Sequence, residues 1–157
     1  MNKTQLLSLV ILRVVVGWHF MYEGIAKFLQ PNWTSGMYLE DSSGWFIGFF
    51  HHIAANPELL KVVDLMNQYG LLLIGFALIS GAFVKIASWG GIALLSLYTL
   101  SHPAIIGSQY LMPMEGSYLW IDKNIIEIAA LLVICLLPSS QTIGVDRFLK
   151  KFLGRLI

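Results

Sequence analysis

The sequence predicts an all-α membrane protein, a bundle of four transmembrane helices with both termini on the cytoplasmic side. Three observations support this prediction. Of the 157 residues, 57% are hydrophobic and only 12% are charged, whereas soluble domains average about 25% charged residues. The apolar residues gather in blocks long enough to cross lipid. The basic residues are distributed unequally between the connections that join these blocks.

Four apolar blocks are expected to span the membrane, at about 6–29, 65–84, 86–105 and 118–137. Each approaches the ~20 residues that a ~30 Å hydrocarbon core requires. The first block is too long for a signal-peptide core and no cleavage pattern follows it, so we expect a retained helix. Only Lys85 separates the second and third blocks, which predicts a tight helical hairpin. The whole chain, 1–157, is expected to form a single membrane domain.

Two segments outside the spans have recognisable patterns. The aromatic residues of 45–50 predict a short outer helix in the membrane interface. Asn56-Pro57-Glu58 is typical of a helix start, so the second spanning helix is expected to begin near Pro57, outside the membrane. The tail 143–157 is a basic amphipathic helix, expected either to attract anionic lipid or to pack on the inner end of the bundle.

The orientation follows from the basic residues, which favour the cytoplasmic side of an inner membrane. With the N-terminus inside, the long connection 30–64 lies outside and carries four of the nine acidic residues. A formal net charge of +1 gives no basic footprint for nucleic acid. The inner side then carries Lys3, Lys85, Arg147, Lys150, Lys151 and Arg155.

The first apolar block contains four ionisable residues, which are costly inside a membrane and should face the interior of the bundle. At about 100° per residue, most of them share one side of the helix with Gly17, and small residues let a neighbouring helix approach closely. Charge and close packing therefore share one face. The four residues are Arg13, His19, Glu23 and Lys27.

The fourth block carries a second polar cluster, with Asn124 and Glu127 on one face and Trp120 a turn above. His102 lies near the outer end of the third block. The outer half of the bundle is thus expected to bring together His19, Glu23, Lys27, His102, Asn124 and Glu127, with Arg13 deeper. A purely structural role stays open, in which Glu23 pairs with Lys27 and Glu127 pairs with Lys27 or Arg13.

Other site types find little support in the sequence. His51-His52 lack the further ligands of a metal site. The chain has no Cys-x-x-Cys motif and no phosphate-binding loop. His19 and His102 both lie near the outer edge, which does not favour haem ligation. We therefore expect no metal and no haem.

The stretch 12–27, with Arg13, Gly17, Phe20, Glu23-Gly24 and Lys27, resembles the opening helix of the DoxX/DoxD-like membrane proteins. The glycine-rich segment 70–81 followed by Lys85, and the segment 122–127, are similar to later parts of that family. The resemblance covers all four blocks. At 67–69 this chain has Asn-Gln-Tyr, where we expect the family to carry an acidic residue.

The resemblance implies a four-helix membrane fold and a role near the quinone pool, as in a thiosulfate:quinone oxidoreductase. The quinone headgroup would be bound by Arg13, Lys27, Asn124, His102 and Trp120, while Glu127, Glu23 and His19 would exchange protons with it. Electrons would come from a soluble or membrane redox partner, or from a small sulfur substrate. The alternative is a non-catalytic membrane scaffold, chaperone or small-solute carrier. The sequence is also compatible with a homo-oligomer.

Overall fold

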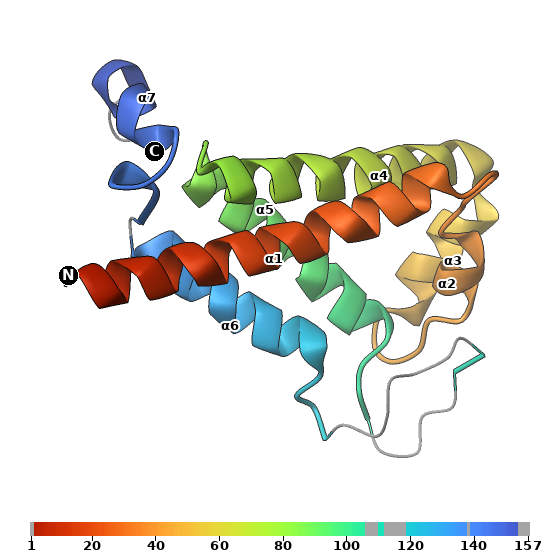
Figure 1. The fold of residues 1–157 in the computed structure, drawn as a ribbon. Coiled ribbons are helices and arrows are strands. Elements are labelled where there is room, and N and C mark those ends of the chain that lie inside the picture. The colour runs from red at the N-terminus through yellow and green to blue at the C-terminus, as the bar shows by residue number, and fades with distance from the viewer. Residues whose placement is uncertain (1, 106–109, 112–118, 138, 154–157) are drawn as a thin grey trace.

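The computed structural model describes residues 2–105, 110–111, 119–137 and 139–153, which form helices and no strands (Figure 1). Three of these helices, α1, α4 and α5, are long and apolar enough to cross a membrane, as expected of an integral membrane protein. The elements are α1 (Lys3–Leu29), α2 (Gly36–Glu40), α3 (Ile47–Ala55), α4 (Pro57–Ser80), α5 (Val84–Ser101), α6 (Lys123–Leu136), the 3₁₀ turn η1 (Ser139–Gln141) and α7 (Asp146–Leu153).

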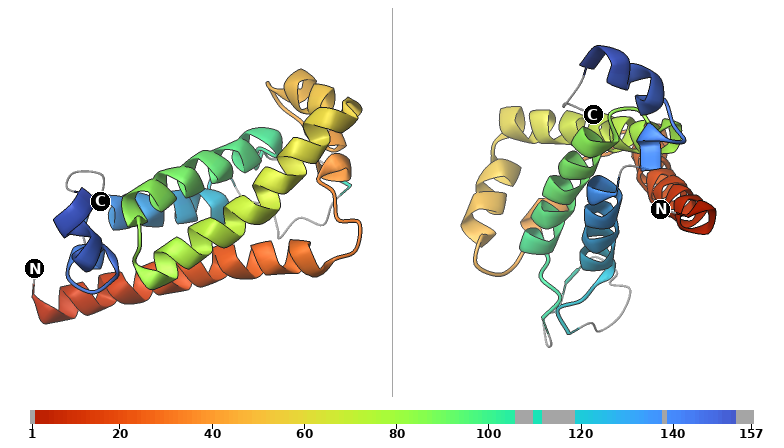
Figure 2. Two further views of the ribbon diagram at one scale, coloured as in Figure 1. Left: turned by 90° about the horizontal axis from the view of Figure 1, so that it is seen from above. Right: turned by 90° about the vertical axis from the view of Figure 1, so that its left-hand side faces the viewer.

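Helices α1 and α4 pack closely because glycines lie at their contact. A Cβ atom on Gly75 would lie 2.5 Å from the backbone nitrogen of Met21, and one on Gly24 would lie 2.9 Å from that of Leu72. Gly17 faces α4 in the same way. The two helices lie side by side near these glycines and diverge toward the start of α4 (Figure 2). The small-residue face predicted on the first helix is thus the α4 contact.

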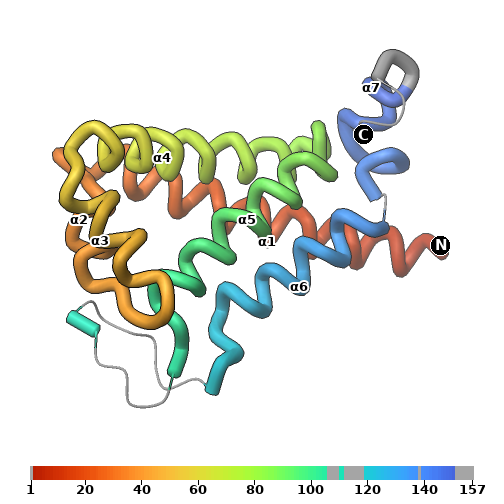
Figure 3. Tube along the Cα trace, turned by 180° about the vertical axis from the view of Figure 1, so that it is seen from behind, coloured from red at the N-terminus to blue at the C-terminus, as the bar shows by residue number. Residues whose placement is uncertain are grey.

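The core lies where α1, α4, α5 and α6 meet. Phe20 of α1 and Leu131 of α6 are both fully buried, and a Cβ atom on Gly91 of α5 would meet both of their side chains. Figure 3 shows α6 beside α5, with its C-terminal end nearest the N-terminal half of α1. The face of α1 that carries Phe20 is therefore turned toward the face of α6 that carries Leu131.

Two predicted boundaries differ from the structure because local chemistry ends or starts the helix. The third apolar block was expected to reach 105, but α5 ends at Ser101, two residues before Pro103, a residue that disfavours helix before it. The fourth was expected at 118–137, but α6 begins at Lys123 because the Asp122 side chain accepts the Ile125 amide. At 14 residues α6 falls short of a full span, and residue 118 lies outside the described residues.

Helices α2 and α3 cover one end of the bundle (Figures 1 and 3). The predicted helix start is confirmed, since the Asn56 side chain accepts the amides of Glu58 and Leu59 and α4 begins at Pro57. The short helix expected from the aromatic residues is α3. The hairpin between α4 and α5 turns at Gly81, whose φ of 72° suits glycine, so the turn precedes Lys85.

The C-terminal segment packs on the opposite end of the bundle. Arg13 donates to the carbonyl of Ile143 at 2.9 Å. The buried Asp146 carboxylate accepts the amides of Phe83 and Val84, at 2.6 and 3.2 Å, which begin α5. The start of the predicted amphipathic tail is therefore attached to the bundle, while Phe148 in α7 is exposed. Residues 154–157 of that tail lie outside the described part of the chain.

Candidate functional site

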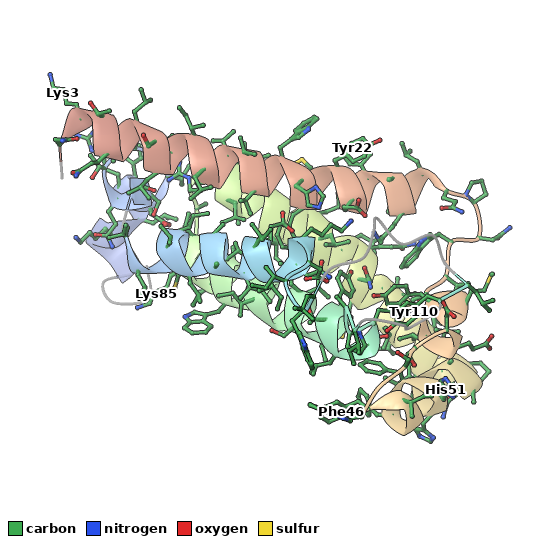
Figure 4. All side chains as sticks on the ribbon, turned by 90° about the horizontal axis from the view of Figure 1, so that it is seen from below. Lys3, Tyr22, Phe46, His51, Lys85 and Tyr110 are labelled. Carbon is green, nitrogen blue, oxygen red and sulfur yellow. The ribbon has the colours of Figure 1, made fainter. Side chains whose placement is uncertain are left out.

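A cavity of about 540 Å³ lies between α1, α4, α5 and α6, and the connection that follows α1 lines one end of it. Figure 4 views the side of the molecule on which α1 and α6 lie, with side chains from both helices between the two ribbons. Eighteen residues line it: His19, Phe20, Glu23, Lys27, Gln30, Asn32, Trp33, Thr34, Ser35, Met37, Tyr38, Asn67, Leu71, Leu95, Tyr98, Lys123, Asn124 and Glu127.

Helix α1 contributes an ion pair to the cavity wall. Lys27 Nζ lies 2.6 Å from Glu23 Oε2, the spacing of four residues that was expected to allow pairing along one helix. The same ammonium lies 5.8 Å from the centre of the Trp33 ring, within reach of a cation–π contact. Lys27 is thus held between a carboxylate and an aromatic face at the end of the cavity nearest α2.

A second pair joins α1 to α6. His19 Nε2 lies 3.8 Å from Glu127 Oε2. The structural alternative expected Lys27 or Arg13 to be the partner of Glu127, but the residue that the structure places there is a histidine. The pair therefore brings an imidazole and a carboxylate together at the wall of the cavity.

The wall formed by α4 and α5 contains polar groups that were not among the predicted site residues. The Tyr98 hydroxyl donates to Asn67 Oδ1 at 2.7 Å. Tyr38 of α2 packs edge-to-face on Tyr98 and also lines the cavity. Burial raises the pKa of Tyr38, so its phenol stays neutral. Asn67, a polar residue within an apolar helix, was a detectable signal, whereas neither tyrosine differs from an ordinary interfacial residue in sequence.

His102 lies beside the cavity and does not line it. Its ring stacks on Tyr38 with centroids 3.9 Å apart. Its Nε2 lies 3.7 Å from Asp41 Oδ2, and its Nδ1 lies 3.0 Å from the Ser101 hydroxyl. His102 therefore supports the position of Tyr38 in the cavity wall. Trp120 is also outside the lining, half exposed, with its amide donating to the Ala104 carbonyl at 3.1 Å.

Arg13 lies at the opposite end of the bundle from α2, away from the cavity lining. Its guanidinium is buried and contacts the Ser139 hydroxyl, at 3.5 Å, besides the Ile143 carbonyl. The structure thus brings together five of the predicted site residues and separates Arg13 from them. Asp146, the acidic residue near Arg13, could not be predicted as its neighbour from the sequence. Its contact with the start of α5 forms only in the tertiary fold.

Within the part of the chain that the structure describes, no group of three or more histidine, cysteine, aspartate or glutamate side chains is arranged to hold a metal ion. The arrangement at the cavity instead suits an organic ligand with hydrogen-bonding oxygens. It offers a cation, a carboxylate–imidazole pair, a phenol and an amide around an apolar floor.

Comparison with known proteins agrees with this fold. The DoxX family model matches residues 8–103, more than half of the chain, from the second turn of α1 to just beyond the end of α5. Neither the curated proteins nor the solved structures gave a match. The match confirms the resemblance noted in the sequence, and the chain belongs to the DoxX family.

Proposed function

We propose that this protein is a quinone-binding subunit of a redox system in the cytoplasmic (inner) membrane. The cavity between α1 and α6 would hold the quinone ring. The single observation that carries the proposal is the meeting of the His19–Glu127 and Glu23–Lys27 pairs in one cavity between apolar helices. Ionisable groups at membrane depth are costly and rare, and for that reason they commonly mark functional sites.

The proposal includes α6 as a fourth membrane-crossing segment and both termini on the cytoplasmic side. Helix α6 is only about 21 Å long at 1.5 Å per residue, but apolar residues outside the helix, at 119–121 and 137, flank it at both ends. Lys3 and Lys85 lie at the same end of the bundle, opposite Phe46 and His51 (Figure 4). The basic end would face the cytoplasm.

The chemistry of the cavity matches the needs of a quinone. Its volume falls within the range of about 300–1,000 Å³ that is usual for small-molecule sites. Lys27 can donate a hydrogen bond to one carbonyl oxygen of the ring. Reduction of a quinone to a quinol takes up two electrons and two protons. The His19–Glu127 pair can deliver one proton to the other oxygen, and water at the exposed α2 end of the cavity would supply the second. The electrons would come from a redox partner or from a small sulfur compound such as thiosulfate.

The test has two measurements on the protein purified in mild detergent. Quinone that co-purifies is extracted and quantified, and the affinity for added quinone is measured by titration. Glu127→Gln keeps the shape of the side chain and removes its charge, so we expect quinone affinity to fall about tenfold while the protein still folds. Glu40→Gln is the matched control, because Glu40 is exposed on α2 and lies outside the cavity lining.

Two results would contradict the proposal. One is a wild-type protein that neither contains nor binds quinone, which would favour a scaffold, chaperone or solute carrier in which the polar pairs hold the fold or bind a solute. The other is equal quinone affinity in Glu127→Gln and Glu40→Gln, which would show that the ring binds elsewhere.

A further inference from the structure

Helix α1 has one tightly packed neighbour and one loosely packed neighbour. It packs far more extensively on α4 than on α6. Its close approach to α6 is at Phe20 and Leu131, both fully buried beside Gly91. One turn before Leu131 on α6, Glu127 Oε2 lies 3.8 Å from Nε2 of His19, the residue that precedes Phe20 on α1.

The polar side chains along this line are unevenly exposed. The His19 and Glu23 side chains are 43% and 39% exposed, whereas those of Glu127 and Lys27 are 17% and 19% exposed. His19 lies well inside a helix that is apolar enough to span a membrane. His19 and Glu23 line the cavity, so their exposure marks an opening on the α1–α6 side, within the length of a helix that could span a membrane.

We infer that the ligand of this cavity is a quinone with a long hydrocarbon tail, which enters sideways between α1 and α6 and leaves its tail in that opening. This inference rests on the proposed function. A cavity of about 540 Å³ is large enough for a ring and the start of a tail, so a long isoprenoid chain must continue outside it. A hydrocarbon chain that lies in an opening toward lipid stays out of contact with water.

The opposite end of the cavity has a different character. Gln30, Asn32 and Thr34 line it next to α2, and all three residues are exposed. This end belongs to the connection after α1, beyond the helix that could span a membrane. The ring oxygens would thus exchange protons with the α2 end, while the tail points toward lipid.

The test blocks the opening without touching the cavity lining. Ala26 is exposed, lies on the same side of α1 as His19 and Glu23, and carries a side chain that leans back over the turn of Glu23, the part of the opening nearer α2. Ala26→Trp should fill the opening with an indole ring. Ala129→Trp is the control, because Ala129 is exposed on the face of α6 that points away from Glu127. Both variants are titrated with two probes, a decyl-benzoquinone and the same ring bearing a methyl group in place of the decyl tail.

We expect Ala26→Trp to weaken binding of the decyl probe about tenfold and to change binding of the methyl probe by less than about twofold. Ala129→Trp should change neither. Equal effects of Ala26→Trp on the two probes, or no effect on either, would overturn sideways entry while leaving quinone binding intact. Failure of the wild-type protein to bind either probe would instead refute the proposed function itself.

Discussion

Gly75→Ala tests whether the close approach of α1 and α4 holds the bundle together. The new Cβ atom would lie 2.5 Å from the Met21 nitrogen, 2.7 Å from the Gly17 carbonyl oxygen and 2.8 Å from the Met21 Cα. All three atoms belong to the backbone, so no side-chain rotation can relieve the clash. The helices must separate, and the contacts on both sides of Gly75 weaken as they do.

Gly70→Ala provides the matched control. Gly70 lies in the same helix, and a Cβ atom there would meet nothing within 4 Å. Both variants gain the same helix propensity, about 0.5–1 kcal/mol for alanine over glycine. The difference between the two therefore isolates the packing cost, which is about 1–3 kcal/mol for an overpacked contact. We expect Gly75→Ala to be less stable than Gly70→Ala by that amount.

The measurement is the free energy of unfolding in mixed micelles, followed by circular dichroism as denaturing detergent is added. Two outcomes would refute the reasoning: equal stability of the two variants, or a more stable Gly75→Ala. Either result would mean that α1 and α4 can separate at Gly75 at no cost.

Three further predictions concern the ends of the bundle. Asp146→Asn should lower the free energy of unfolding by about 1.5–3 kcal/mol, measured in the same assay, because the carboxylate is buried and caps the start of α5; unchanged stability would contradict this. Deleting 143–157 should destabilise the bundle, whereas deleting 150–157 should not. Only the longer deletion removes Asp146 and the Ile143 carbonyl that is bonded to Arg13. Equal thermal stability of the two truncations would show that these contacts do not stabilise the bundle. In a cysteine-free background, Glu40→Cys and Thr142→Cys, both at exposed positions, should react with an impermeant thiol reagent from opposite sides of the membrane, and labelling from one side would overturn the proposed topology.

Much of the helical layout was predictable because it depends on local chemistry. The apolar blocks predicted four membrane-spanning helices, of which α1, α4 and α5 are long and apolar enough to cross a membrane. The Asn56-Pro57 pair predicted the start of α4 from capping alone. The side of α1 that carries charge and glycine was also predictable, since the helical period relates neighbouring residues. The predicted end of α5 and the predicted start of α6 were less accurate. Hydropathy alone does not show that a proline or an aspartate cap sets a helix boundary.

The partners of the charged residues were decided only by the tertiary structure. The sequence placed Arg13 and Glu127 in the bundle interior, but it could not show that Arg13 meets the C-terminal segment while Glu127 meets His19. Such pairings depend on the rotation and crossing of helices that are distant in the chain. The glycine contacts draw α1 onto α4, which turns the His19 edge of α1 toward α6 and leaves the cavity between them.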